Sequence, residues 1–374
     1  MKIQMVDLEG QYKKIKTEID TTIISCIEST SFINGPAVKD FQFNLEQYLG
    51  VKHVIPCANG TDSLLIAMLA LDLKPGDEVI CPAFTYVATA EVIALLGLKP
   101  VMVDVDSNTF NLTANTIEKA ITSRTKAVVP VHLYGQSCDM EPIMKLAEKY
   151  KLYVIEDNAQ AIGADYTFSN GNVAKTGTIG HIGSTSFFPS KNLGCFGDGG
   201  ALMTNDDELA NKMRMIANHG QEVKYYHKVL GCNSRLDTIQ AAILNVKLRF
   251  LEDYCTARNS VANYYDEAFS NISELEIPAR EKKSTHVFHQ YTLKVKGGKR
   301  NELQNHLAQK GIPTMIYYPL PLYKQEAFAH FVESDFELKT TKHLCDVVLS
   351  LPIHTEMKSK HLNFICNTIK LFFN

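Results

Sequence analysis

Residues 184–200 read STSFFPSKNLGCFGDGG, and this stretch decides the fold prediction. An apolar run typical of a strand precedes Lys191, and a glycine-rich segment follows it. A lysine beside an apolar core loses hydration of its ammonium group, which lowers its pKa and makes the amine a nucleophile. A lone lysine is more often an exposed residue in a turn. The rest of the sequence decides between these two interpretations.

Short apolar runs and helical patterns alternate on the amino-terminal side of this stretch. The expected strands are HVIPC (53–57), EVICP (78–82), PVMVDVD (100–106), KAVVPVHLY (126–134), KLYVIED (151–157), STSFFP (184–189) and GGALMTN (199–205). The expected helices between them cover residues 61–73, 86–98, 113–122 and 139–150. The strand runs show little polar alternation, which is typical of a mostly parallel sheet buried on both faces.

The pattern changes after residue 205. The expected elements are a helix at 206–217, one long helix or two within 234–267, a strand at 286–296 and a helix at 301–311. We therefore predict a large α/β domain over residues 1–240 and a small α+β domain over 241–374. Residues 1–30 are expected to pack on the small domain or on a partner chain.

Three further features follow strands on the large domain. Asp157 ends a strand run, and open α/β sheets bind ligands at the carboxyl ends of their strands. Asp157 could therefore keep a pyridinium nitrogen protonated. The alternative is a helix N-cap. Asn59-Gly60-Thr61-Asp62 opens a helix, and its N–H groups suit a phosphate or ordinary capping. Tyr86 could stack on a flat ring or lie in the core. Their order along the chain, ending at Lys191, is typical of fold type I enzymes that use pyridoxal phosphate (PLP).

Longer motifs carry a resemblance over nearly the whole chain. They are MVDLEGQY (5–12), FINGP (32–36), CANGTDSL (57–64), PAFTYVATAE (82–91), VIEDNAQAIGA (154–164), SFFPSKNLGCFGDGG (186–200), GCNSRLDTIQAAIL (231–244) and YYPLPLYKQEAF (317–328). In these motifs the sequence resembles the DegT/DnrJ/EryC1/StrS aminotransferases, which act on nucleotide-linked keto-sugars. The resemblance implies the aspartate aminotransferase-like PLP fold, fold type I, with a large mostly parallel sheet domain and a small α+β domain.

The resemblance also implies roles for individual residues. Lys191 would attach PLP and, once freed, move a proton to or from the substrate carbon. Asp157 would pair with the pyridine nitrogen, Gln160 would approach the phenolic oxygen or the ring face, and Tyr86 would stack on the ring. The expected phosphate ligands are Gly60, Thr61 and Ser186, with the backbone N–H of Asp62 as a further donor.

The same resemblance implies a homodimer with shared active sites. Asn233 would reach the phosphate bound by the neighbouring subunit, and Arg235 could help to bind substrate across that interface. His289, Tyr317 and Tyr318 are candidate substrate-lining residues, and packing of the small domain is the equally open alternative. No metal is expected in the site.

The implied reaction has two halves. L-glutamate converts PLP to pyridoxamine phosphate, and that amine is then transferred to a UDP- or TDP-linked keto-sugar, expected to be a 3-keto sugar, for bacterial surface polysaccharide such as O-antigen. A 4-keto sugar substrate and a non-catalytic PLP-binding regulator are the alternatives. Lyase relatives that deoxygenate C3 replace the lysine with histidine, so Lys191 favours amino transfer. GCFGDGG does not fit the G-x-G-x-x-G pattern of nicotinamide dehydrogenases.

Composition excludes several other classes. The formal net charge is −3, from 38 basic and 41 acidic residues, which offers no global attraction to nucleic acid or membranes. No apolar run reaches the ~18–20 residues of a membrane span, and the charged first residues do not resemble a signal peptide. Nine cysteines without a CxxC pair argue against structural zinc and predict free thiols. We therefore expect a cytoplasmic protein.

Overall fold

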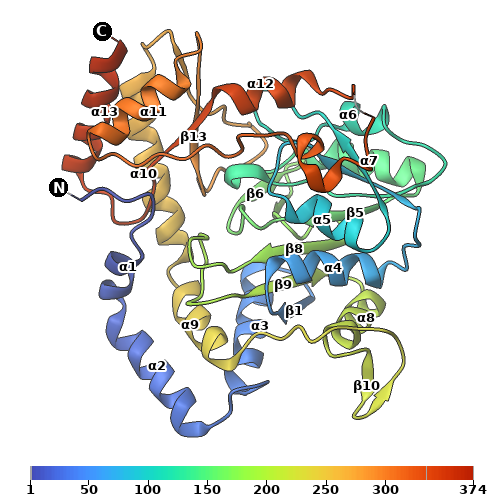
Figure 1. Cartoon of the computed structure of the whole chain (residues 1–374). Helices are drawn as coiled ribbons and strands as arrows, with labels where there is room; N and C mark the ends of the chain where they lie inside the picture. The colour runs from blue at the N-terminus through green and yellow to red at the C-terminus, as the bar shows by residue number, and fades with distance from the viewer. Residues whose placement is uncertain (1, 334, 374) are drawn as a thin grey trace.

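A seven-stranded sheet forms the centre of the protein in the computed structural model, which describes residues 2–333 and 335–373 (Figure 1). The strand order is β1-β9-β8-β5-β4-β2-β3. β9 runs antiparallel to both of its neighbours, and the other adjacent strands are parallel. The bounds are β1 (His53–Cys57), β2 (Glu78–Pro82), β3 (Lys99–Val103), β4 (Thr125–Val128), β5 (Tyr153–Asp157), β8 (Ile182–Ser186) and β9 (Gly200–Thr204). The predicted large, mostly parallel sheet is confirmed.

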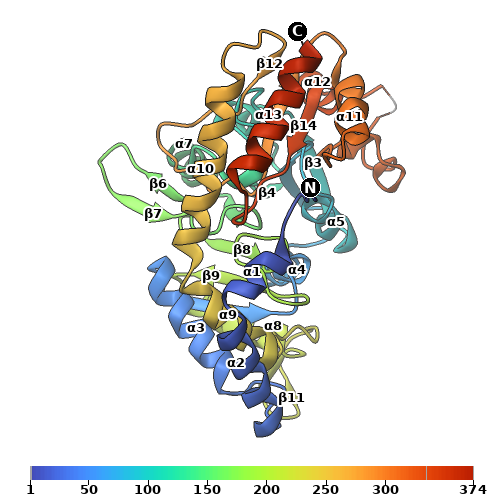
Figure 2. The same cartoon turned by 90° about the vertical axis from the view of Figure 1, so that its left-hand side faces the viewer.

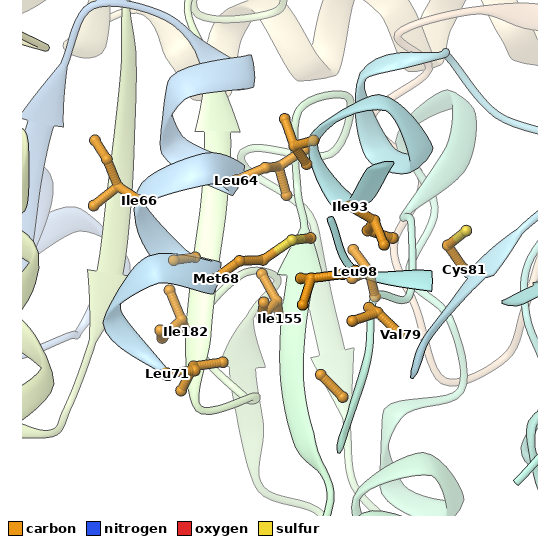
Figure 3. Close-up of a cluster of buried hydrophobic side chains, with 14 of the residues drawn as sticks. Leu64, Ile66, Met68, Leu71, Val79, Cys81, Ile93, Leu98, Ile155 and Ile182 are labelled. Carbon is orange, nitrogen blue, oxygen red and sulfur yellow. The ribbon is translucent and has the colours of Figure 1, made fainter. Parts of the chain in front are cut away.

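Helices bury both faces of this sheet. Val79 and Cys81 of β2 belong to a core that α4, α5 and α8 cover, and Figure 3 shows its side chains. Ile80, between them, belongs to the opposite core, which includes residues of α6 and α7. Towards β1 and β9, α3 and α9 contribute to a further core. These helices are α3 (Pro36–Leu49), α4 (Gly60–Ala70), α5 (Ala88–Leu95), α6 (Ala114–Glu118), α7 (Met140–Tyr150), α8 (Asp207–Ala217) and α9 (Thr238–Leu248).

The carboxyl-terminal part has an antiparallel sheet of its own. Its strands are β12 (Leu275–Glu276), β13 (Tyr291–Val295) and β14 (Val348–Leu351), in that order. The associated helices are α10 (Leu251–Phe269), α11 (Arg300–Gln309), α12 (Lys339–Val347) and α13 (Ser359–Phe373). Residues of α10, α11 and α13 share a separate apolar core with this sheet, and Figure 2 shows α10 and α13 lying along each other.

The amino-terminal segment contacts both parts of the chain. Ile3 lies in the carboxyl-terminal core, and the Met5 carbonyl accepts a hydrogen bond from the Ile353 N–H at 3.3 Å. α1 (Leu8–Lys14) is followed by α2 (Lys16–Ser29), which packs against α9 through Ile19 and Ile243. The division into domains at residue 240 stays a prediction.

Several elements differ from the sequence-based expectation. The stretch 234–267 forms two helices, α9 and α10. The expected strand 126–134 ends with β4 at Val128, before Pro130, which has no N–H for a strand ladder. The expected strand 286–296 begins only at Tyr291, and the expected helix 113–122 is the shorter α6.

The remaining elements are short. They are η1 (Leu133–Gly135), β6 (Asp165–Thr167), β7 (Val173–Lys175), β10 (Gln221–Val223), β11 (Tyr226–His227), η2 (Leu322–Lys324) and η3 (Glu326–Phe328). Across residues 2–333 and 335–373, no helix combines the length and the apolar character needed to cross a membrane. All nine cysteines are free thiols, as predicted.

Candidate active site

The candidate residues gather at the carboxyl ends of the central strands. Asp157 is the last residue of β5 and Ser186 is the last residue of β8, and these two strands are parallel neighbours. Tyr86 follows β2, and Gly60 follows β1 and opens α4. Lys191 lies in the loop that follows β8. This is the edge at which open α/β sheets bind ligands.

Asp157 is a buried carboxylate held by two donors. Its Oδ2 accepts a hydrogen bond of 2.8 Å from the Thr89 hydroxyl, and its Oδ1 accepts one of 3.1 Å from the Ala159 N–H. The two hydrogen bonds fix the orientation of the Asp157 side chain at the end of β5. Sequence reasoning identified Asp157 and missed Thr89. The available signal was a hydroxyl residue in the predicted helix that begins at Tyr86.

Glu156 secures the end of β5 from the opposite face of the sheet, because side chains alternate along a strand. It is fully buried, and His132 Nε2 lies 2.8 Å from its Oε2. Its oxygens also accept the N–H groups of Gly177, Ile179 and Gly180. Burial opposes ionisation of Glu156, but His132 and these N–H groups outweigh it and lower the pKa of the carboxyl group. Sequence reasoning missed this network.

Lys191 lies within electrostatic reach of Asp157. Burial lowers the pKa of the Lys191 amine to about 8, and the charge of Asp157 acts in the opposite direction. The backbone N–H of Lys191 donates to the Phe188 carbonyl at 2.8 Å, which closes the turn that carries it. Because its pKa is lowered, more of this amine is unprotonated near neutral pH than in an exposed lysine, as a nucleophile requires.

The first turn of α4 forms a backbone cradle against β8. A Cβ added to Gly60 would lie 2.7 Å from the Cβ of Ser186, so a side chain at residue 60 would collide with the strand end. The Asp62 N–H donates to the Asn59 side chain at 2.8 Å. Asp62 is therefore already engaged in capping, and the N–H groups of Gly60 and Thr61 remain as candidate phosphate donors.

Gln160 connects two loops across the site. Its Oε1 accepts the Tyr134 N–H at 2.7 Å, and its Nε2 donates to the Tyr318 hydroxyl at 3.2 Å. The Tyr318 ring lies 6.4 Å from the exposed Tyr86 ring, centroid to centroid, and burial raises the pKa of the Tyr318 hydroxyl. The Tyr134 hydroxyl donates to the Tyr317 carbonyl. The structure thus brings Tyr318 next to Gln160 and Tyr317 next to Tyr134.

His289 is buried close to Lys191. Burial, then the charges of Lys191 and Arg258, keep the pKa of His289 well below its ordinary value, so the imidazole is neutral. Its Nδ1 is buried and has no hydrogen-bond partner among the described residues.

The loop that carries Asn233 and Arg235 lies beside this chain's own β1–α4 connection. The Ser234 hydroxyl accepts the Ala58 N–H at 3.1 Å, while Asn233 is exposed and Arg235 is half-buried. Whether these two side chains reach a second subunit stays a prediction.

Comparison with known proteins identifies the chain's relatives. The profile of the DegT/DnrJ/EryC1/StrS aminotransferase family matches residues 13–370. The "Pleiotropic regulatory protein" of Geobacillus stearothermophilus is 45% identical over 375 residues, covering 100% of this chain and 99% of that protein. The UDP-2-acetamido-2-deoxy-3-oxo-D-glucuronate aminotransferase of Pseudomonas aeruginosa is 44% identical, covering 97% and 98%. The UDP-N-acetyl-3-dehydro-alpha-D-glucosamine 3-aminotransferase of Acidithiobacillus ferrooxidans is 43% identical, covering 98% and 97%.

Solved structures agree in fold over the same length. A DegT DnrJ EryC1 StrS aminotransferase from Brucella abortus superimposes with a TM-score of 0.94 at 38% identity, covering 100% of each chain. The NtdA protein of Bacillus subtilis, solved with bound cofactor PMP, gives a TM-score of 0.89 at 32% identity, covering 96% of this chain and 82% of that one.

The chemistry of the site fits PLP, a pyridine aldehyde that carries a phosphate. Lys191 has a depressed pKa and can attach an aldehyde carbon, and the Asp157 carboxylate suits the ring nitrogen. The close approach of Gly60 to Ser186 leaves a cradle of backbone N–H groups for the phosphate. The protein is a PLP-dependent aminotransferase. The chain belongs to the DegT/DnrJ/EryC1/StrS aminotransferase family.

Proposed function

We propose that this protein transfers the amino group of L-glutamate to the C3 ketone of a UDP- or TDP-linked sugar for bacterial surface polysaccharide. One observation supports the proposal: the charge of Asp157 acts on the buried amine of Lys191 in a chain that matches 3-oxo-sugar aminotransferases over nearly its whole length. A dTDP-3-amino-3,6-dideoxy-alpha-D-galactopyranose transaminase, 40% identical over 370 residues, extends the same reaction type to a dTDP sugar.

In the proposed mechanism, this chain's residues hold the reactants and move protons. When bound, the PLP ring accepts the electron pair released at the reacting carbon. Asp157, held by Thr89, keeps a proton on the ring nitrogen. Lys191 takes a proton from the donor carbon and returns one to the sugar carbon, which its pKa of about 8 allows near neutral pH. The N–H groups of Gly60 and Thr61, with the Ser186 hydroxyl, bind the phosphate.

The surrounding residues would orient the reactants. The exposed Tyr86 ring is free to stack on a flat ring, and Gln160 is fixed from both ends for a polar contact with it. Arg235 has no ion pair among the described residues, so its guanidinium is available for a phosphate or a sugar carboxylate. His289, Tyr317 and Tyr318 complete the proposed substrate wall.

We propose a homodimer in which Asn233 of one subunit completes the phosphate site of the other. Exposed apolar side chains support an interface on the amino-terminal helices, including Ile24, Ile27 and Phe43. Nine free thiols support a cytoplasmic location. Light scattering measures the oligomeric state and an amino-transfer assay measures the activity. A fully active monomer would contradict the shared site.

A regulatory role is the second candidate, because the Geobacillus relative carries that name. The intact Lys191, Asp157 and Gln160 favour catalysis, since a regulator has no need of a proton-transfer group. The test is a panel of UDP- and TDP-linked 3-keto and 4-keto sugars with L-glutamate, with Lys191→Ala as the control. Amino transfer to the 3-keto sugars alone is expected. Transfer to 4-keto sugars alone would contradict the ring position, and no transfer to any sugar would favour the regulator.

A further inference from the structure

The loop after β8 folds back on the strand end that precedes it. The Cys195 N–H donates to the Phe187 carbonyl at 2.8 Å, and the Cys195 thiol donates to the same carbonyl at 3.0 Å. Inside this loop, the Lys191 N–H closes a turn on the Phe188 carbonyl at 2.8 Å. Residues 187–195 therefore form a closed loop that contains Lys191.

Gly194 packs directly on the turn that carries Lys191. A Cβ added to Gly194 would lie 2.8 Å from the Phe188 carbonyl oxygen and would also collide with the Pro189 carbonyl. Because the Phe188 carbonyl accepts the Lys191 N–H, Gly194 lies against the acceptor of the bond that closes the turn. A displacement of Gly194 is therefore transmitted to the turn, since close-packed atoms leave no space between the two backbones.

Lys247 of α9 binds the backbone of Gly194. Its Nζ donates a hydrogen bond to the Gly194 carbonyl and lies 5.4 Å from the centroid of the Phe196 ring. The Lys247 side chain is buried, and burial lowers the pKa of its amine to about 8. The hydrogen bond does not depend on this pKa, because the ammonium and the neutral amine both have N–H groups to donate.

A fully buried lysine is rare unless an acidic group pairs with it. Lys247 has no carboxylate partner among residues 2–333 and 335–373. Methionine would fill a similar volume without a charge to remove from water, so packing alone does not call for a lysine here. What the lysine adds at this position is the hydrogen bond to Gly194.

Gln240, two turns earlier on α9, binds the next part of the same loop. Its Oε1 accepts the Phe196 N–H at 2.8 Å, and its Nε2 donates to the Phe196 carbonyl at 3.4 Å. Residues seven apart lie on one face of a helix. One face of α9 therefore binds the loop backbone at two points, through Lys247 at Gly194 and through Gln240 at Phe196.

We infer that Lys247 and Gln240 are positioning residues for Lys191, because they hold the backbone of residues 194–196 against the turn that carries it. The inference rests on the proposed role of Lys191 as the residue that attaches PLP. An amine attacks an aldehyde carbon efficiently only when the two atoms are aligned about 3–3.5 Å apart, so a small shift of the turn slows the attachment. The placement of Lys191 thus depends on two side chains of α9.

The test separates the binding of PLP from its attachment. Cofactor-free protein is mixed with saturating PLP, and equilibrium dialysis measures how much is bound. The Lys191 amine and the PLP aldehyde condense with loss of water, and borohydride added at a series of times reduces the C=N bond to a stable C–N bond. Mass spectrometry of the peptide that contains Lys191 then gives the attachment rate. Lys247→Met is expected to lower this rate about tenfold while PLP still binds.

Lys294 of β13 provides a matched control. It is also a buried lysine whose Nζ donates to a backbone carbonyl, that of Ser107 at 2.8 Å, and it pairs with Glu276 as well. Lys294→Met therefore removes at least as many contacts as Lys247→Met does, but away from the Lys191 loop. The attachment rate in Lys294→Met should equal that of the wild type. Gln240→Leu, at a partly exposed position, should lower the rate severalfold.

Two results would overturn the inference: a wild-type attachment rate in Lys247→Met, or an equal fall in Lys247→Met and Lys294→Met. Where Lys247→Met does not fold, Gln240→Leu decides, and an unchanged rate in that variant rejects the inference. A wild-type protein that never attaches PLP at Lys191 would refute the proposed role of Lys191 itself. Because the measurement uses neither L-glutamate nor a sugar, failure of the proposed sugar reaction would leave its outcome unaffected.

Discussion

The Thr89 hydroxyl donates a hydrogen bond of 2.8 Å to the Asp157 carboxylate, and it does so from the first turn of α5 across to the end of β5. Both groups are buried, so this bond fixes the direction in which the carboxylate faces. The second oxygen is occupied by the Ala159 N–H. The residue proposed to hold the pyridine nitrogen is thus oriented before any ligand arrives.

Loss of the Thr89 hydroxyl is predicted to impair turnover more than folding. Thr89→Val keeps the shape but removes a hydrogen bond to a charged group, worth about 1.5–3 kcal/mol, so kcat/KM with L-glutamate should fall at least about tenfold. Thr89→Ser, which keeps the hydroxyl, should retain most activity. Steady-state kinetics and thermal unfolding of both variants provide the check, and an active Thr89→Val enzyme would remove Thr89 from the site.

The charge of Asp157 is predicted to control the titration of Lys191. Asp157 raises the pKa of Lys191 against the larger lowering effect of burial. In Asp157→Asn, the pH midpoint for acylation of Lys191, followed by mass spectrometry in cofactor-free protein, should therefore fall below about 8. The same variant should retain the fold and lose most transamination activity. A midpoint that stays at 8 or rises would show that the two groups do not interact.

The depressed pKa of Lys191 also predicts how its contribution to stability depends on pH. Between about pH 8 and the unfolded value near 10.4, the unfolded chain binds more protons at this residue than the folded chain does. Stability should therefore rise with pH across this window in the wild type, and less so in Lys191→Met. Urea unfolding at pH 7.5, 8.5 and 9.5 measures the difference, and parallel curves would contradict it.

The close approach at Gly60 is predicted to be essential for cofactor affinity. Gly60→Ala places a Cβ about 2.7 Å from the Ser186 Cβ, so the first turn of α4 must shift away from β8. We expect PLP to bind at least about tenfold more weakly, measured by titration of cofactor-free protein, because the N–H groups no longer converge. Unchanged binding in Gly60→Ala would locate the phosphate elsewhere.

The buried Glu156 is predicted to contribute stability as an anion. In Glu156→Gln, an amide NH2 would face the backbone N–H donors that now bind the carboxylate. This change should reduce the free energy of unfolding by ~3 kcal/mol. The pKa of Glu156 is lowered in the folded state, so its stabilisation is present above about pH 4.5 and is lost as the pH falls towards its folded value. The wild-type advantage over Glu156→Gln should therefore shrink in acid. An advantage that is constant from pH 3 to 7 would contradict this.

Local sequence patterns were sufficient to predict the central sheet and to place Asp157 and Lys191 at its carboxyl edge. Asp157 and Lys191 follow apolar strands directly, and the topology of parallel strands brings such positions to one edge. The expected strand 286–296 was wrong for its first half, because the chain bends at Phe288, where Arg258 donates to the Phe288 carbonyl and Asn192 donates to the Val287 carbonyl.

The supporting contacts were not predictable from the sequence. Thr89, Tyr134 and Arg258 reach the site through contacts with residues far away in the chain, and no local periodicity reports such partners. From sequence alone, an arginine on a helix is expected to be exposed, and only the structure shows which segment buries it. The role of Asn233 also stays a prediction, since its proposed partner is on another chain.

The most direct test of the central claim is a single-turnover experiment with the purified holoenzyme. L-glutamate alone should bleach the visible absorbance of bound PLP and release one equivalent of 2-oxoglutarate per site, and a UDP-linked 3-keto sugar added afterwards should restore the absorbance. Lys191→Ala should do neither while keeping its fold. Bleaching and recovery at wild-type rates in Lys191→Ala would contradict the account, as would a wild-type protein that glutamate leaves unchanged.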